Sequence, residues 1–179
     1  PMPKGPFADQ ITVIPSGGAA KRLLLEPIAN PVGDRHSALG SGPHYDAAVG
    51  VNRGLTFRPK LVPEDYRLGM RLCVSLSSSA AGGAVKVYFQ VRELAMDGDS
   101  QAQTLLGHMA AVLMPQTANQ TIRVSVPLTI APTVGRLLQP VVILYRTDTT
   151  MDTNGGTVSV WGTWLEYGAK MGIWSPIGA

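Results

Sequence analysis

The segment 137–167 reads LLQPVVILYRTDTTMDTNGGTVSVWGTWLEY, and it decides the fold. Two apolar runs, 141–145 and 157–167, flank a polar stretch that carries Asn-Gly-Gly at 154–156. The second run alternates with a period of two and is rich in β-branched and aromatic residues, which is typical of a β-strand. Asn and Gly tolerate positive φ, so the chain can reverse between the runs. We therefore predict that the two runs form an antiparallel pair.

The faces of the second run follow from strict alternation along a strand. One face receives Val158, Val160, Gly162, Trp164 and Glu166, and the other receives Thr157, Ser159, Trp161, Thr163, Leu165 and Tyr167. Large rings then lie on both faces. We expect such a strand to be covered on both sides, by its own domain or by a neighbouring subunit.

Length and composition favour one charge-poor β domain. A chain of 179 residues has room for a single domain with a sizeable core. Only 15% of its residues are charged, whereas about a quarter are charged in a typical soluble domain. Two interpretations fit this low value: an ordinary β protein, or a subunit that buries much of its surface against neighbours.

Cysteine, glycine and proline add to this description. Gly and Pro are spread along the whole chain, as expected for many short strands joined by turns. Cys73 is the single cysteine, so no disulfide forms within the chain, and its apolar surroundings predict a small buried side chain. No apolar run approaches the ~20 residues of a membrane span. The first residue is Pro1, which fits removal of an initiator Met, cutting from a longer precursor, or an N-terminus that this sequence does not include.

The alternating patterns predict eight strands and a jelly roll. The expected strands are 21–28, 49–57, 67–77, 84–94, 105–113, 121–130, 140–146 and 156–167. We expect 67–77 and 84–94 to form a hairpin-like pair, and Pro127 to lie at a sheet edge or a bend. The run 105–113 also fits a helical face, but its surroundings favour a strand. The prediction is an all-β, eight-stranded antiparallel jelly-roll sandwich of two packed four-stranded sheets.

The whole chain, 1–179, is predicted to be a single domain in three parts. Residues 1–19 form an extended N-terminal arm with three prolines in its first six positions. Residues 20–168 form the sandwich. Residues 169–179 form a C-terminal tail.

Catalytic and metal-binding patterns are weak in this sequence. The sequence has three histidines, His36, His44 and His108, and their spacing is not that of zinc ligands. The sequence also has no Gly-x-Ser-x-Gly motif that would provide a nucleophilic serine for a histidine base. Asp97 with Asp99 resembles a fragment of a Ca²⁺ loop but fits a polar turn better. Asp148 and Asp152 bracket a loop next to a strand pair, where a Ca²⁺ shared at a subunit contact is a weakly supported alternative. We expect no enzyme activity, no cofactor and no bound metal.

Several stretches resemble the coat proteins of small icosahedral positive-strand RNA viruses that have a single jelly roll. The strand with a proline at 124–129, the final runs at 141–145 and 157–167, and the middle runs at 66–76 and 85–91 carry this resemblance. The absence of an Arg-rich arm and the non-Met start make the chain most similar to the picorna-like group, whose small subunits are cut from a polyprotein. Coat proteins with a basic arm are the alternative group.

The resemblance implies a structural protein that assembles, alone or with sister subunits, into a shell around a viral RNA genome. Its location would be the virion, and the host cytoplasm during assembly, without a membrane partner. Apolar residues of the termini are the expected inter-subunit contacts: Phe7, Ile11, Val13, Trp174 and Ile177. The alternative is that these ends fold back on their own domain. Lys4, Lys21 and Arg22 are candidates for weak, non-specific RNA contact, against the alternative of solvated charges.

Two other functions compete with this interpretation. A carbohydrate-binding β-sandwich would stack sugar rings on Trp161, Trp164 and Tyr167. Trp161 and Trp164 are an odd number of residues apart, so alternation puts them on opposite faces and disfavours a shared platform. A cupin-like enzyme would need a set of metal-binding histidines on strands, and the three histidines here are not so placed.

Overall fold

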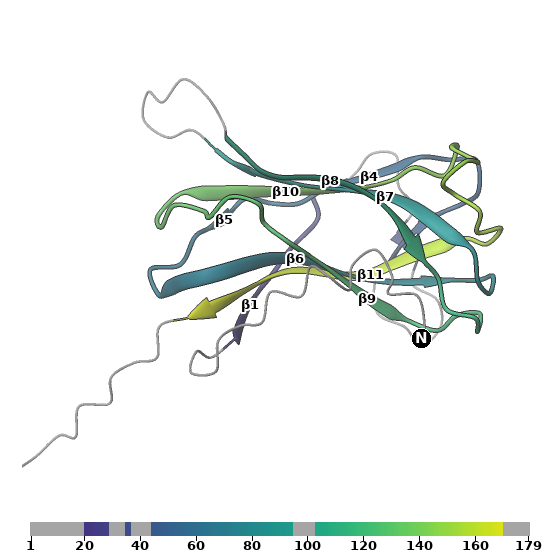
Figure 1. The fold of residues 1–179 in the computed structure, drawn as a ribbon, viewed down its shortest axis with the longest axis horizontal. Coiled ribbons are helices and arrows are strands. Elements are labelled where there is room, and N and C mark those ends of the chain that lie inside the picture. Colours follow the sequence, from purple (N-terminus) through teal and green to yellow (C-terminus); the bar gives the residue numbers. More distant parts are fainter. Residues whose placement is uncertain (1–19, 29–34, 37–43, 95–102, 170–179) are drawn as a thin grey trace, which may run out of the picture.

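The structure is a computed structural model that describes residues 20–28, 35–36, 44–94 and 103–169 (Figure 1). These residues form eleven strands, and they contain no helix that could cross a membrane. The strands are β1 (Ala20–Leu24), β2 (Arg35–His36), β3 (His44–Ala47), β4 (Arg53–Thr56), β5 (Lys60–Leu61), β6 (Tyr66–Ser78), β7 (Ala84–Glu93), β8 (Gln103–Leu113), β9 (Ile122–Pro127), β10 (Leu137–Leu144) and β11 (Val158–Ala169).

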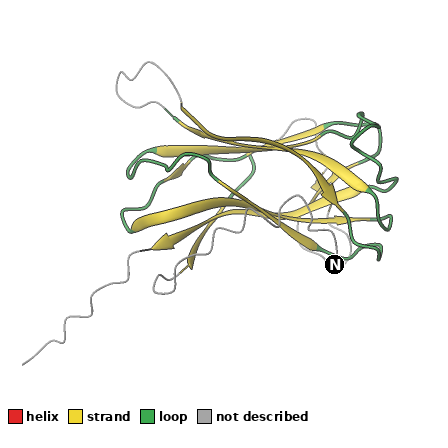
Figure 2. Cartoon of the chain, in the orientation of Figure 1, coloured by secondary structure: helices red, strands yellow, loops and turns green. Residues whose placement is uncertain are grey.

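The strands form two antiparallel sheets that pack face to face, as Figures 1 and 2 show. The six-stranded sheet has the order β2-β3-β11-β6-β9, and β1 also pairs with β11. The five-stranded sheet has the order β4-β10-β7-β8, and β5 also pairs with β10. The predicted jelly-roll sandwich is therefore present. Three short strands, β2, β3 and β5, enlarge the two four-stranded sheets that the sequence predicts.

Two predicted strand pairs are wrong, although the strands themselves exist. The runs that give β10 and β11 do not pair, because β10 belongs to the five-stranded sheet and β11 to the six-stranded one. The predicted pair of β6 and β7 fails in the same way. In both cases the chain crosses from one sheet to the other. A turn signal shows that the chain reverses, but not whether the next strand joins the same sheet.

The core lies between the sheets and follows the alternation of the sequence. From β6 come Met70, Leu72, Val74 and Leu76, and from β7 come Val85, Val87, Phe89 and Val91, all buried. The alternation of β6 predicts Leu68 on the same face, but it is 36% exposed. Cys73 is buried as predicted. The ambiguous run 105–113 is a strand, and Pro127 ends β9 at the sheet edge.

One end of the sandwich gathers four connections, 48–52, 79–83, 114–121 and 145–157, and we name it the loop end (Figure 1). Backbone hydrogen bonds join these connections to one another, for example from Gly50 to Arg146 and from Gly82 to Pro115. The Asn-Gly-Gly at 154–156 lies here. Neither Gly155 nor Gly156 has positive φ, so the conformational reason that the sequence suggested for them is wrong.

Close packing explains Gly156 instead. A Cβ at this position would collide with the backbone nitrogen of Ala80 and lie 2.7 Å from the hydroxyl of Ser78. At Gly155 a Cβ would meet nothing within 4 Å. The two neighbouring glycines therefore differ in how closely the surrounding atoms pack against them. Of these two, Gly156 is the one that lets the 145–157 connection lie directly on the 79–83 connection.

Candidate functional surfaces

A β-bulge in β11 decides which aromatic side chains share a face. The pairing of β11 with β6 shifts register between Val160 and Gly162, so Trp161 is the extra residue. Before the bulge Val158 and Val160 are buried in the core, and after it Thr163 and Leu165 are buried. Trp161 and Trp164 are both half-buried on the outer face of the six-stranded sheet. The expectation that they lie on opposite faces is wrong.

The correction extends to the other side chains of β11. Val158 and Val160 face the core, whereas Trp164 lies on the outer face with the arginines that contact it. The two groups were predicted on one face. Tyr167 is buried, and its ring lies 6.2 Å from that of Tyr66. Tyr167 therefore does not extend a platform made by the two tryptophans.

Trp164 is the centre of a charged cluster on this outer face. The guanidinium carbons of Arg22, from β1, and Arg123, from β9, lie 5.4 and 5.3 Å from its ring centroid. Both arginines also donate to Glu166 Oε2, at 3.2 Å from Arg22 Nε and 2.8 Å from Arg123 Nη2. Three strands thus contribute to one Arg–Trp–Arg arrangement around a single carboxylate.

The electrostatics of the cluster follow from these contacts. Partial burial acts to raise the pKa of Glu166, but hydrogen bonds and charge from Arg123, with a further hydrogen bond from Arg22, hold that pKa below its usual value. Two positive groups face one negative group, so the cluster keeps an excess of one positive charge. Its chemistry suits a contact with an anion, including a phosphate group.

The predicted RNA-facing residues are only partly described. Lys21 forms an ion pair with Asp65, and Arg22 belongs to the cluster around Glu166. The bond from Lys21 and another from the Tyr167 hydroxyl lower the pKa of Asp65. Burial, with the Asp65 charge, raises the pKa of Tyr167 to about 12. Both predicted cations thus have carboxylate partners, and Lys4 lies outside the described residues.

The predicted inter-subunit contacts also lie outside the described residues: Phe7, Ile11, Val13, Trp174 and Ile177. The described part has other apolar groups on its surface. Ten large apolar side chains are 36–71% exposed. They comprise Leu24 and Ile28 in and after β1, Val49 and Val51 at the loop end, Leu61, Leu68, Ile130 and Val134 in or near the connections of the opposite end, and Met109 and Leu113 on β8.

A buried ion pair at the loop end was not predicted. Arg146 Nε donates to Asp152, and its other nitrogens donate to the carbonyls of Ala47 at 3.1 Å and Asn154 at 2.6 Å. The Asn154 side chain in turn accepts from Ser78 and donates to the Gly82 carbonyl. The only sequence signal was a cation directly after an apolar strand. This network ties the 145–157 connection to the 79–83 connection and to the ends of β3 and β6.

The candidate Ca²⁺ residues have other partners or are not described. Asp148 forms an ion pair with Lys86 and accepts from Thr150, and these hydrogen bonds lower its pKa strongly. Asp152 is bound to Arg146. Asp97 and Asp99 lie outside the described residues. Within the described ranges, no group of three or more His, Cys, Asp or Glu side chains could hold a metal ion.

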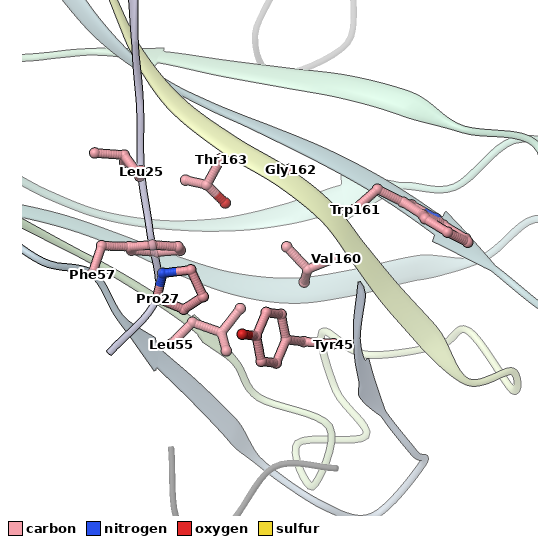
Figure 3. A pocket seen from close by; sticks show the side chains of 9 residues that line it. All are labelled: Leu25, Pro27, Tyr45, Leu55, Phe57, Val160, Trp161, Gly162 and Thr163. Atoms are coloured by element: carbon pink, nitrogen blue, oxygen red, sulfur yellow. The ribbon is translucent and has the colours of Figure 1, made fainter. Parts of the chain in front are cut away.

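A pocket of about 190 Å³ opens beside the bulge in β11 (Figure 3). It is lined by Leu25, Pro27, Tyr45, Leu55, Phe57, Val160, Trp161, Gly162 and Thr163. Residues from both sheets contribute, because Leu55 belongs to β4 and Val160 to β11. Most of the lining is apolar, and none of it is charged.

Comparisons with known proteins give no family for this chain. No protein-family model and no curated protein matches it. Among solved structures it is similar to a family 16 carbohydrate-binding module-2, with 13% identity, 74% of this chain and 82% of that chain covered, and a TM-score of 0.43.

Two further structures have a comparable likeness. A family 11 carbohydrate-binding module from Clostridium thermocellum, in complex with a β-1,3-1,4-mixed-linked tetrasaccharide, gives 10% identity, 86% coverage of each chain and a TM-score of 0.40. The K3 cleaved adhesin domain of Lys-gingipain from Porphyromonas gingivalis W83 gives 14%, 69% and 73% coverage, and 0.37. With TM-scores below 0.5, these likenesses carry no argument about function.

Proposed function

We propose that this chain is a structural coat protein that assembles, with copies of itself and with any sister subunits, into an icosahedral shell around an RNA genome. The observation that carries the proposal is the set of ten exposed apolar side chains on a charge-poor jelly roll. Single exposed apolar residues are ordinary on any protein. Here they occur at both ends of the sandwich, in and after β1 and on β8, so several sides of the domain offer apolar contacts to neighbouring subunits.

The fold agrees with this proposal but does not select it. Jelly rolls occur in viral capsids, in lectins and in cupins, and a fold by itself does not define a function. A shell differs from the other two in needing many self-complementary contacts of modest strength, repeated around symmetry axes. Apolar groups distributed over several sides of the domain meet that need better than one concave site does.

The test is the native mass of the full chain and the effect of charges at the exposed apolar positions. Light scattering and negative-stain imaging of the wild type are expected to give megadalton particles of uniform diameter. Leu24→Asp, Val49→Asp and Leu61→Asp each place a charge on a different side, and at least one should abolish the particles while the domain stays folded. Thr117→Asp, at an exposed polar position of the loop end, is the matched control. A wild-type chain that stays monomeric with every candidate sister subunit present would overturn the proposal.

A carbohydrate-binding module is the second candidate, and the bulge in β11 favours it. Trp161 and Trp164 share the outer face of the six-stranded sheet, so the sequence-based objection to a joint stacking platform is removed. Against this, two guanidinium groups already lie against the Trp164 ring and compete with a sugar for it. An oligosaccharide array and a sugar-dependent rise in melting temperature, both lost in Trp161→Ala, would replace the shell proposal with this one.

A further inference from the structure

The outer face of the six-stranded sheet carries a third arginine near Trp164. Both neighbours of Arg71 in β6 are buried in the core, so Arg71 points to the outer face. Arg71 lies directly opposite Glu166, and Glu166 lies opposite Arg22. Side chains at opposite positions of antiparallel strands share a face, with Cβ atoms about 5 Å apart. Arg22 and Arg71 therefore flank Glu166, and Arg123 reaches the same carboxylate from β9.

The carboxylate of this cluster is covered, whereas its arginines reach the solvent. Glu166 is 7% exposed, but the side chains of Arg22 and Arg123 are 58% and 41% exposed. Each of these arginines uses one nitrogen for Glu166, Nε in Arg22 and Nη2 in Arg123. A guanidinium group has five N–H donors in all. Glu166 thus holds two guanidinium groups at the surface, where their further donors face a second anion.

The charge of the strands that build this face is strongly positive. Glu166 is the only acidic residue in β1, β6, β9 and β11. The same four strands contain five basic residues: Lys21, Arg22, Arg67, Arg71 and Arg123. Lys21 is paired with Asp65 from outside these strands. The region around Trp164 is therefore complementary to a partner with several negative charges.

The arrangement suits a chain of phosphate groups with unpaired bases. Arg22 and Arg71 lie two strand spacings apart, roughly 10 Å, so a single phosphate is too small to contact both. Guanidinium groups bind phosphate oxygens through charge-assisted hydrogen bonds, and their planes are surfaces on which unpaired bases stack. Leu24, opposite Trp164 and 71% exposed, extends the apolar part of the face. In a duplex the bases are already stacked, so these features favour a single strand.

We propose that this face binds the backbone of single-stranded RNA without sequence preference. Arg22 and Arg123 contact phosphates, Arg71 adds to the positive field, and bases stack on the guanidinium planes. The choice of RNA among polyanions rests on the shell proposal. The contact itself lies on one chain, so its binding can be measured separately from assembly.

The test is the binding of a fluorescein-labelled oligouridine to the full chain, followed by fluorescence anisotropy over a series of salt concentrations. The double variant Arg22→Gln with Arg123→Gln removes two cations of the face. It should weaken binding at low salt by about tenfold or more, and reduce the slope of log affinity against log salt by about 0.7 for each lost phosphate contact. Arg22→Gln alone leaves Arg123 on Glu166 and should give about half of the change in slope.

Arg58→Gln with Arg92→Gln is the matched control. It makes the same change in net charge at two exposed arginines, one in the connection after β4 and one on β7 of the other sheet. Its affinity should stay within about twofold of wild type, because charges far from the contact are screened. The melting temperature of each variant shows whether it is folded, and Arg22→Gln decides the matter if the double variant is not.

Two further probes test the nature of the partner: inorganic polyphosphate and a duplex of oligoadenosine with oligouridine. Both should bind more weakly than the single strand. The proposal is overturned if wild type does not bind oligouridine, if either further probe binds as tightly, or if the folded arginine variants bind as the control does. Light scattering separates the two proposals. Particles whose RNA binding does not depend on the arginines overturn this proposal alone, whereas arginine-dependent binding without particles supports it and counts against the shell.

Discussion

The loop end and the outer face of the six-stranded sheet each contain a carboxylate held by arginine, and they differ in burial. At the loop end the side chains of Arg146 and Asp152 are 0% and 3% exposed. On the outer face the side chains of Arg123 and Glu166 are 41% and 9% exposed. A buried pair cannot lose one partner without leaving a desolvated charge, whereas the exposed arginine of the second pair can turn to water or to another molecule. We call the Arg146–Asp152 pair the structural lock, because losing either partner would destabilise the fold. The Arg123–Glu166 pair is available for an interaction.

The largest expected effect comes from breaking the lock. Arg146→Met leaves the Asp152 carboxylate and the carbonyls of Ala47 and Asn154 without their donor. The free energy of unfolding should fall by about 3–5 kcal/mol, measured by chemical denaturation followed through tryptophan fluorescence. The double variant Arg146→Met with Asp152→Leu removes the orphaned charge and should recover part of the loss. A loss below about 1 kcal/mol in the single variant would contradict the lock.

A smaller effect is expected from packing at the same end. Gly156→Ala forces the 145–157 connection away from Ala80 and Ser78, and should cost about 1–3 kcal/mol, as overpacking does. Gly155→Ala is the matched control, because its Cβ enters open space, and it should change stability by less than about 0.5 kcal/mol. Equal melting temperatures for the two variants would show that Gly156 is not under close contact.

The positions of the strands were predictable because each shows its period directly in the sequence. Val85, Val87, Phe89 and Val91 alternate with polar residues, and all four are buried. Pairing was less predictable. The run that gives β11 has the same alternation whichever sheet it joins, and only long-range packing decides that β10 lies opposite rather than beside it. Local patterns therefore identified the strands but not their neighbours.

The candidate surfaces were harder to predict for a related reason. One extra residue, Trp161, reverses every later side chain of β11, and Gly162 beside it was the available signal for a bulge. Arg146 gave no local sign that a connection would fold over it, since burial of a loop residue depends on the other three connections at that end. Both failures came from contacts between residues far apart in the sequence.

The smallest expected effect concerns the Glu166 carboxylate, whose arginine partners are exposed, and its pH dependence. Because the folded-state pKa of Glu166 lies below the ordinary glutamate value of 4.5, its charge stabilises the fold above that value, and this contribution is lost as the pH falls through the folded-state pKa. Glu166→Gln should reduce stability at neutral pH by about 0.5–1 kcal/mol, a small loss because its arginine partners are well exposed.

The pH series separates this effect from a general loss of packing. Wild type and Glu166→Gln should converge in stability as the pH is lowered from about 5 toward 3, where the wild-type carboxylate becomes protonated. Added salt should narrow the difference at neutral pH, since screening weakens exposed charge pairs. A difference that stays constant across pH and salt would mean that the Gln side chain disturbs packing. A neutral-pH loss as large as that of Arg146→Met would mean that the outer face is as much a structural lock as the loop end.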